Sequence, residues 1–288
     1  MRISNWKEYE LLDASTGERL ERFGNIILIR PDPQIIWETE KSHPMWSQAH
    51  ARYLRSRTGG GHWEEYKEIP PVWRIHYDAI TLQLKTMGFK HTGVFPEQAV
   101  NWELIKQKIR AANREVKILN LFAYTGAATL AAASAGAKVC HVDASKGMVS
   151  WARENAVVSG MKEKPIRWIV DDCIKFVQRE IRRGNRYDGI IMDPPSYGRG
   201  PGGEVWKLEE ELFSFVTMCK NLLSDDALFL LLNSYTTGLS PAVMEYLLGT
   251  VIKKQRGGIV SAEEIGLPVQ TSGLVLPCGS TAVWQSNS

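Results

Sequence analysis

The segment Leu119 to Asp143 contains the residues whose types and spacing most clearly suggest chemistry. It reads as a buried strand, a tight turn at Gly126, an Ala-rich helix closed by Gly136, and a second strand that ends in Asp143. A carboxylate at the end of a second parallel strand, roughly 20 residues past a glycine turn, can accept hydrogen bonds from both hydroxyls of a ribose. The segment therefore predicts the front half of a nucleotide-type cofactor site.

The glycine pattern narrows the choice of cofactor. A dinucleotide needs clustered glycines so that its pyrophosphate can approach the backbone at a helix N-terminus. Here Gly126 is followed by Ala127, Ala128 and Thr129. A cofactor with a ribose but no phosphate fits this turn better, and S-adenosylmethionine is the common one. The same pattern disfavours a nicotinamide dehydrogenase.

Two later segments place more polar groups directly after strands. Asp172 follows a strand at 166–170 and precedes a basic helix at 173–183, so it faces the cofactor or caps that helix. The run Asp193-Pro194-Pro195-Ser196-Tyr197 follows a strand at 187–192. Its prolines either only end the strand, because proline cannot donate to the ladder, or fix the backbone stiffly. In the second case the backbone carbonyls and the Tyr197 ring could meet a base.

The elements that must position these residues alternate between strand and helix. Such alternation predicts an α/β fold with a parallel sheet and right-handed crossovers. The tail at 267–284 reads as two strands joined through Gly273, and such an antiparallel pair can extend a sheet edge. Beyond the segments already named, we expect a helix at 145–159 with Ser145 as its N-cap. We also expect helices at 207–223 and 241–256, and a strand at 227–232.

The first ninety residues differ in character from the rest. Six tryptophans fall within residues 1–102, amid polar turns and short β-like runs. We expect a small Trp-rich, β-rich domain at 1–90 and a cofactor-binding domain at 91–288. Arg52, Arg55 and Arg57 precede the run 58–63, which ends in Trp63. This loop could grip single-stranded RNA by phosphate neutralisation and stacking, or it could be a solvated loop on a Trp-packed core.

Composition sets broad limits. A formal net charge of +3 permits a nucleic-acid partner without requiring one, and 44% hydrophobic residues suffice for a real core. No apolar run is long enough to span a bilayer, so we expect no membrane association. The four cysteines show no paired metal spacing, so we expect no metal and reduced thiols in a cytoplasmic protein. Nothing in the sequence predicts an oligomeric state.

Five segments in order resemble one family. They are TGVFPEQAVNW at 92–102, NLFAYTGAATLAAA at 120–133, VDASKGMVSWARENA at 142–156, VDDC at 170–173 and DPPSYGRGPGGEVWKLEEE at 193–211. Over roughly 90–285 the chain resembles a class I S-adenosylmethionine-dependent methyltransferase, of the bacterial group that modifies large-subunit (23S) ribosomal RNA on cytosine C5 or guanine N7. The resemblance implies a Rossmann-like, mostly parallel, seven-stranded sheet, and ribosomal RNA as the partner.

The resemblance also implies a set of site residues. It assigns the turn Tyr124, Thr125 and Gly126 to the methionine end of the cofactor, Asp143 to the ribose, and Asp172 to the adenine amino group. It places Asp193, with Pro194, Pro195 and Tyr197, beside the transferring methyl as catalytic residues. Near the cofactor it further implies Phe95, Gln98, Ala144, Ser145 and Asn155. The chain departs from some relatives at Ala99 and Trp102, where they have basic residues.

The atom that receives the methyl depends on cysteine. Methylating C5 of a pyrimidine needs a thiolate to add at C6 and then a base to remove the C5 proton. C5 relatives carry that cysteine in the loop after the fifth strand or within the Asp-Pro-Pro motif. Here 233–237 and 193–197 contain none. Guanine N7 has a free lone pair, so orientation can suffice. We therefore predict an N7 methyltransferase, with C5 methylation by an unusual thiol and a non-catalytic cofactor-binding protein as alternatives.

Overall fold

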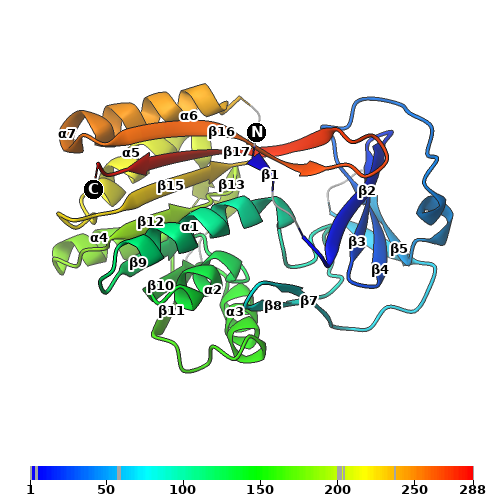
Figure 1. The fold of residues 1–288 in the computed structure, drawn as a ribbon, viewed down its shortest axis with the longest axis horizontal. Coiled ribbons are helices and arrows are strands. Elements are labelled where there is room, and N and C mark those ends of the chain that lie inside the picture. The colour runs from blue at the N-terminus through cyan, green and yellow to red at the C-terminus, as the bar shows by residue number, and fades with distance from the viewer. Residues whose placement is uncertain are drawn as a thin grey trace. The chain divides into compact units, whose positions relative to one another are not determined.

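Five neighbouring parallel strands form one side of the larger sheet, up to its edge (Figure 1). The strand order is β1-β16-β17-β15-β12-β9-β10-β11, and β17 pairs antiparallel with β15. The predicted Rossmann-like sheet of seven mostly parallel strands is confirmed, and the two-residue β1 adds an eighth at the edge. The strands are β1 (Arg2–Ile3), β9 (Lys117–Leu121), β10 (Lys138–Asp143), β11 (Ile166–Val170), β12 (Gly189–Met192), β15 (Phe229–Ser234), β16 (Ile259–Pro268) and β17 (Val275–Gln285).

The structure is a computed structural model that describes residues 2–3, 6–56, 60–199, 203, 205–236 and 238–287. The chain forms two compact units. One comprises Val100–Ile265 and Cys278–Ser288 with the first two residues, and the other comprises Ile3–Ala99 with Gly266–Pro277. The division into domains at residue 90 stays a prediction, because compactness alone does not show which segment folds independently.

Helices cover both faces of the large sheet. Figure 1 shows α5 and α6 on the opposite side of the sheet from α1, α2 and α3. The helices are α1 (Ala99–Ala111), α2 (Ala127–Ser134), α3 (Lys146–Val158), α4 (Cys173–Arg182), α5 (Leu208–Lys220), α6 (Pro241–Leu248), the π-turn η3 (Gly249–Lys253) and α7 (Lys254–Arg256).

The helix ends follow from local sequence. Gly136, at φ 100°, ends α2 with bonds from its own N–H to the Ala133 carbonyl and from the Ala137 N–H to the Ala132 carbonyl. This is the Schellman arrangement, which favours glycine because its φ is positive. Ser145 caps α3 and accepts from the Met148 N–H at 3.4 Å. The predicted roles of Gly136 and Ser145 as caps are confirmed.

Two predicted boundaries are wrong. β16 begins at Ile259 rather than at 267, because Glu263 and Glu264 break the apolar pattern while the backbone stays paired in the sheet. The helix expected at 241–256 is interrupted after Leu248 by the π-turn η3.

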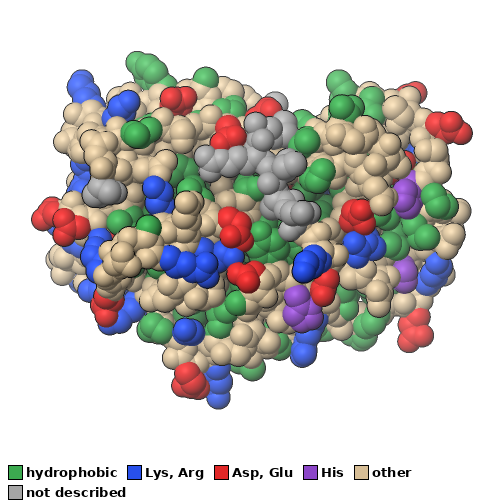
Figure 2. All heavy atoms as spheres, viewed as in Figure 1, with side chains coloured by type: hydrophobic (Ala, Val, Ile, Leu, Met, Phe, Trp, Pro, Cys, Tyr) green, Lys and Arg blue, Asp and Glu red, His purple; other side chains and the backbone are tan. Residues whose placement is uncertain are grey.

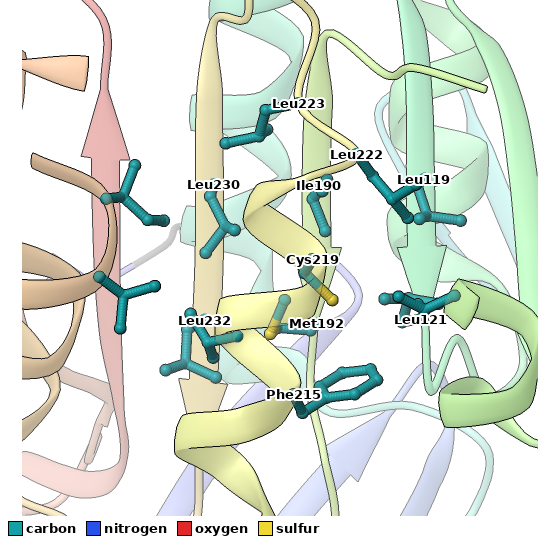
Figure 3. Packing of buried hydrophobic residues seen from close by; sticks show 14 of the residues in the cluster. Leu119, Leu121, Ile190, Met192, Phe215, Cys219, Leu222, Leu223, Leu230 and Leu232 are labelled. Atoms are coloured by element: carbon teal, nitrogen blue, oxygen red, sulfur yellow. The ribbon is translucent and has the colours of Figure 1, made fainter. Parts of the chain in front are cut away.

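One hydrophobic cluster lies between the sheet and the helices α4, α5 and α6. Figure 3 shows Leu119 and Leu121 of β9 and Ile190 and Met192 of β12 facing Phe215 and Cys219 of α5. Cys219 is fully buried there, as its apolar neighbours in the sequence predict. This core fixes β9 and β12 side by side, which matters because both strands lead into the site.

The unit of 3–99 and 266–277 is β-rich, as predicted. It contains the sheet β2 (Tyr9–Ser15), β3 (Glu18–Phe23), β4 (Ile26–Pro31), β5 (Ala51–Arg55) and β6 (Gly61–Glu65), and the pair β7 (Trp73–Tyr77) and β8 (Ile80–Leu84). Short helices η1 (Pro44–Gln48) and η2 (Pro96–Gln98) complete it.

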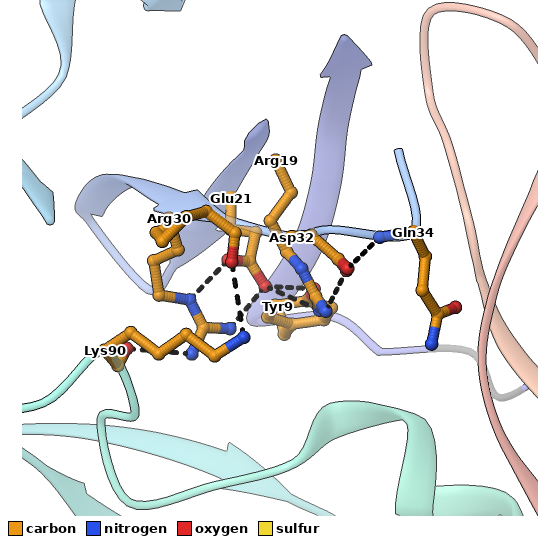
Figure 4. Close-up of polar contacts among 8 residues, drawn as sticks. Tyr9, Arg19, Glu21, Arg30, Asp32, Gln34 and Lys90 are labelled. Atoms are coloured by element: carbon orange, nitrogen blue, oxygen red, sulfur yellow. Dashed lines mark hydrogen bonds and ion pairs between the residues drawn. The ribbon is translucent and has the colours of Figure 1, made fainter. Parts of the chain in front are cut away.

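A buried ion pair organises this second unit (Figure 4). Glu21 accepts from Arg30 through two bonds of 2.6 Å and from the Tyr9 hydroxyl at 2.8 Å. Burial raises the pKa of Glu21, but the Arg30 and Arg19 guanidiniums outweigh it and hold that pKa below its usual value. A charged pair survives here because its hydrogen bonds are made inside the fold.

The proposed RNA-gripping loop is only partly described, since Arg57 to Gly59 lie outside the described residues. Of its neighbours, Arg52 pairs with Glu18 at 2.7 Å, and Trp63 packs edge-on against Tyr53. These contacts favour the packed-loop interpretation for Arg52 and Trp63. On the face drawn in Figure 2, Lys and Arg side chains are interspersed with Asp and Glu, so charge alone does not mark an RNA surface there.

Candidate active site

The candidate site lies where the strand order of the large sheet reverses. The chain runs from β9 outward to β10 and β11, and then returns to β12 on the other side of β9. Ligands of open α/β sheets bind outside the carboxyl ends of the strands at such a point. Leu121 of β9 lies opposite Met192 of β12, so the glycine turn and Asp193 leave neighbouring strands at the same edge.

The turn after β9 has a left-handed backbone at three positions. Phe122, Tyr124 and Gly126 have φ values of 55°, 51° and 86°. Such values are uncommon for bulky residues and store strain that functional sites often carry. A Cβ at Gly126 would lie 2.9 Å from the Ala152 Cβ of α3, so glycine is required here for space as well as for φ.

Asp143 joins this turn to the start of α3. Its Oδ2 accepts from the Tyr124 N–H at 2.8 Å, and its Oδ1 accepts from the Ser145 N–H at 2.9 Å. Burial raises the pKa of Asp143, although these two backbone donors act in the opposite direction. Each oxygen has two lone pairs and uses one of them in these bonds. The carboxylate can therefore still accept two hydrogen bonds from a ligand.

Asn155 supports the same turn from α3. It is fully buried, and its Nδ2 donates to the Thr125 carbonyl at 2.9 Å. Ala144 is half-buried and Ser145 is exposed at the first turn of α3. The structure thus brings together Tyr124, Thr125, Gly126, Asp143, Ala144, Ser145 and Asn155, with Asn155 on the protein side of the turn.

Asp172 caps α4, the alternative that the sequence leaves open. Its Oδ1 accepts from the Lys175 N–H at 2.9 Å. β11 pairs in parallel with β10, so Asp172 leaves the sheet at the same edge as Asp143. A carboxylate can accept about four hydrogen bonds, and capping uses one of them. Its neighbour Asp171 forms an ion pair with Arg179.

The Asp-Pro-Pro segment is held by groups far away in the sequence. Asp193 Oδ1 accepts from Asn233 Nδ2 at 3.0 Å, and Pro194 is buried. The Trp206 indole N–H donates to the Pro195 carbonyl at 2.6 Å. That carbonyl is therefore already engaged, which corrects the idea that the carbonyls of this segment all point at a base. The Trp206 bond instead fixes the segment from the side.

Tyr197 is the exposed aromatic of this edge. It opens β13 (Tyr197–Arg199), which pairs with β14 (Val205–Lys207), and 53% of its surface is accessible. On the other side of this hairpin, Trp206 packs between Phe122 and Phe215, at ring-centroid distances of 5.1 and 5.4 Å. The hairpin is thus anchored on its inner side and presents Tyr197 on its outer side. Residues 200–202 and 204 of the quoted motif lie outside the described residues.

Phe95 and Gln98 belong to the unit that comprises Ile3–Ala99 and Gly266–Pro277. Phe95 precedes η2, and its ring lies 4.9 Å from that of His91. Gln98 ends η2, and both side chains are half-buried. Their proposed part in cofactor binding stays a prediction.

The cysteines are all buried. Burial raises the pKa of Cys140 to about 11 and raises the pKa values of Cys173 and Cys219 further. The Cys173 side chain is buried in the hydrophobic cluster between the sheet and α4, α5 and α6, so it packs as a core group. A thiol with a raised pKa is protonated at neutral pH and is a poor nucleophile.

Sequence reasoning missed the supporting residues Trp206 and Asn233, and Thr281, whose hydroxyl donates to Asn233 Oδ1 at 2.7 Å. The signal that could have drawn attention to Asn233 is its place at the end of the apolar run of β15, where a buried amide requires partners. Trp206 carried no comparable signal, because tryptophan in a short strand is equally typical of a core.

Together, the sheet order, the strained glycine turn and the carboxylates at one edge define a Rossmann-like domain that binds a nucleoside cofactor. The S-adenosylmethionine-dependent methyltransferase family model matches residues 37–211. A crystal structure of a SAM-dependent methyltransferase from Agrobacterium tumefaciens is 37% identical, with a TM-score of 0.94, and the match covers 99% of this chain and 93% of that one. The chain therefore belongs to the S-adenosylmethionine-dependent methyltransferases.

Curated relatives match a shorter part of the chain. Ribosomal RNA large subunit methyltransferase K/L of Pseudoalteromonas atlantica is 31% identical over 140 residues, which is 48% of this chain and 19% of the relative. The protein of the same name from Shewanella baltica is 32% identical over 143 residues, or 49% and 18%. The match thus spans about a fifth of the length of these relatives.

S-adenosylmethionine is the cofactor of this family, and the site fits it. Asp143 keeps acceptor capacity for two ribose hydroxyls, and Asp172 keeps capacity for an amino group. Within the described ranges, no helix could cross a membrane. Among the same residues, no group of three His, Cys, Asp or Glu side chains could hold a metal ion.

Proposed function

We propose that the chain methylates large-subunit ribosomal RNA, with guanine N7 as the acceptor atom. The names of the curated relatives support the substrate class. The choice of guanine N7 rests on one observation about the site. The Asp193 carboxylate and the exposed Tyr197 ring lie at the point where the strand order reverses, whereas the cysteine thiols are buried. A ribosomal RNA substrate also implies a cytoplasmic protein.

Cofactor binding is assigned to the edge formed by β9, β10 and β11. Asp143 would accept from the ribose hydroxyls while holding the turn through the Tyr124 N–H. Asp172 would accept from the adenine amino group while capping α4. Tyr124, Thr125 and Gly126 would line the methionine end, and Ala144, Ser145, Phe95 and Gln98 would lie near the cofactor. Asn155 would act indirectly, because its amide binds the Thr125 carbonyl.

The chemistry asks for little beyond placement and charge. S-adenosylmethionine supplies an electrophilic methyl group on a positively charged sulfur. Guanine N7 would accept the methyl group through its own lone pair and would lose no proton. The bond between the methyl carbon and the sulfur would break as the bond to N7 forms, so S-adenosylhomocysteine would leave and the base would carry the positive charge. Asp193 stands at the neighbouring strand end, where a fixed carboxylate stabilises that charge. Tyr197 would stack on the base, and Pro194 and Pro195 would hold both side chains in place.

Cytosine C5 chemistry is less well supported. It requires a thiolate that adds to C6, whereas burial raises the pKa values of Cys140, Cys173 and Cys219. Position 237 of the loop after β15 lies outside the described residues, but it is a threonine. The strands that bear the site therefore offer positioning groups rather than a nucleophile.

The test is mass analysis of nucleosides from 23S ribosomal RNA incubated with the protein and deuterated-methyl S-adenosylmethionine. We expect labelled 7-methylguanosine, and about tenfold to a hundredfold less of it with the Asp143→Ala variant at limiting cofactor. Labelled 5-methylcytidine would favour the cytosine alternative. A protein that instead binds the cofactor in calorimetry could yet label no nucleoside in naked RNA or in ribosomal subunits. That result would favour a non-catalytic cofactor-binding protein.

We also propose that residues 1–90 and 91–288 are separate domains. The β-rich character of the first ninety residues supports this division. Limited proteolysis should then cut near residue 90 and leave a fragment that still binds S-adenosylhomocysteine.

A further inference from the structure

We propose that Thr281 and Asn233 are positioning residues for methyl transfer, because together they fix the direction of the Asp193 carboxylate. Neither side chain belongs to the predicted site, and each lies on a strand away from the glycine turn. The inference rests on the proposed function, since it takes Asp193 to act on the base that receives the methyl group.

Three hydrogen bonds form a continuous chain that ends on Asp193. Asn101 Nδ2 of α1 donates to Thr281 Oγ1 of β17 at 2.9 Å, and the Thr281 hydroxyl donates to Asn233 Oδ1 at 2.7 Å. Asn233 Nδ2 then donates to Asp193 Oδ1 at 3.0 Å. Asn101, Thr281 and Asn233 are 1%, 3% and 0% exposed, so water cannot replace these bonds.

The direction of donation decides how the Asn233 amide is turned. A hydroxyl has one hydrogen, and Thr281 spends it on Asn233 while its oxygen accepts from Asn101. The carbonyl end of Asn233 must therefore face β17, and its amino end must face Asp193. The strand register supports this, because Asn233 and Thr281 lie directly opposite each other. If the amide turned over, its carbonyl would face the carboxylate and repel it.

An amide suits this task because it orients a carboxylate without supplying a counter-charge. A lysine or arginine at position 233 would bind Asp193 more strongly, but it would offset the negative charge that a cationic product requires. Small displacements of a catalytic group can cost about a hundredfold in rate. A side chain that sets only the direction of Asp193 is therefore expected to alter turnover without touching the cofactor or the RNA.

The decisive variant is Thr281→Val, which keeps the shape of the side chain and removes its hydroxyl. We expect kcat to fall about tenfold to a hundredfold, while the KM for RNA and the Kd for S-adenosylmethionine stay within about twofold of wild type. Thr281→Ser restores the hydroxyl and should restore kcat. Asn101→Ala removes the buried hydrogen bond from Asn101 to the Thr281 hydroxyl, but the Thr281 hydroxyl can still donate to Asn233. It should lose stability, measured by urea unfolding, while it keeps most of its turnover.

A double-variant comparison separates positioning from a general structural effect. If Thr281 acts only through Asp193, adding Thr281→Val to Asp193→Ala should lower the residual kcat no further. If Thr281→Val does not fold, Thr281→Ala removes the same hydroxyl with less crowding and takes its place in both measurements. The inference is overturned if the folded variant turns over at the wild-type rate. It is equally overturned if Ser and Val substitutions lower kcat alike, or if the two substitutions act additively.

The same experiment keeps this inference distinct from the proposed function. Absence of any methyl transfer by the wild-type protein would refute the proposed function. Transfer by the wild type that is undiminished in Thr281→Val would refute the positioning role alone.

Discussion

Replacing Asp143 by alanine tests the cofactor site most directly. Asp143 holds both the turn, through the Tyr124 N–H at 2.8 Å, and the start of α3, through the Ser145 N–H at 2.9 Å. The remaining lone pair of each oxygen is available to a ribose hydroxyl. A hydrogen bond to a charged group contributes about 1.5 to 3 kcal/mol. The loss therefore corresponds to a rise in Kd of roughly tenfold to a hundredfold.

That range is the contribution of one hydrogen bond rather than two, because water can take over one of the two ribose hydroxyls in the variant. The upper end includes the cost of a less ordered turn, because Phe122 and Tyr124 hold strained backbone angles that the Asp143 contact helps to maintain. Asp143→Asn keeps the shape and one acceptor oxygen, so its Kd should lie between those of the wild type and Asp143→Ala.

Isothermal titration calorimetry with S-adenosylmethionine and with S-adenosylhomocysteine measures this effect. The matched control is Asp171→Asn, which removes the same charge from the end of the neighbouring strand, where it pairs with Arg179. The control should bind both ligands within about twofold of wild type. If Asp143→Ala also binds within twofold, Asp143 only connects the turn to α3 and the ribose assignment is wrong. Thermal unfolding of each variant shows whether a lost affinity reflects a lost fold.

Four further outcomes follow from the same geometry. The Cys173→Ala and Cys219→Ser variants should retain turnover if they fold. The wild-type protein should form no covalent adduct with RNA that contains 5-fluorocytosine, and such an adduct would support C5 chemistry. Tyr197→Ala should slow methyl transfer about tenfold to a hundredfold with unchanged cofactor affinity, because a base-stacking contact contributes roughly 1 to 3 kcal/mol, whereas Tyr197→Phe should be nearly normal. Gly126→Ala should destabilise the fold by more than about 1 kcal/mol in urea, given its φ of 86° and the nearby Ala152 Cβ. Burial raises the pKa of Asp143, and protonation of its carboxylate removes an acceptor for the ribose. The affinity for the cofactor should therefore decrease as the pH is lowered. This decrease should begin at a pH above the usual aspartate pKa of about 4.

Local sequence was sufficient to predict a helix or strand wherever the signals for that element lie within one short segment. The apolar run before Gly126 and the cap residues Gly136 and Ser145 predict β9, α2 and α3 closely, because their signals lie within a few residues. β16 shows the limit of this approach. Its charged residues Glu263 and Glu264 resemble a loop in isolation, and only its place in the sheet beside β17 keeps that stretch extended.

The support of the site could not be predicted for the same reason. The hydrogen-bonded pairs that support the site are far apart in the sequence. Trp206 and Pro195 are separated by 11 residues, Asn233 and Asp193 by 40, and Thr281 and Asn233 by 48. Each bond depends on which strands become neighbours, and no periodicity of one segment contains that information. The positive φ of Tyr124 is similarly invisible, because a tyrosine rarely adopts it unless the surrounding structure imposes it.

The placement of charge links this architecture to the proposed reaction. Methyl transfer to guanine N7 moves positive charge from the cofactor sulfur to the base, so a useful active site holds a negative group near the acceptor. Asp193 lies beside the glycine turn and is oriented by the neutral amide of Asn233. A C5 enzyme would instead need a thiolate there, yet Cys173 is buried in the core and burial raises its pKa. The edge is therefore better suited to receiving positive charge than to delivering a nucleophile, which is why we place the methyl group on a ring nitrogen.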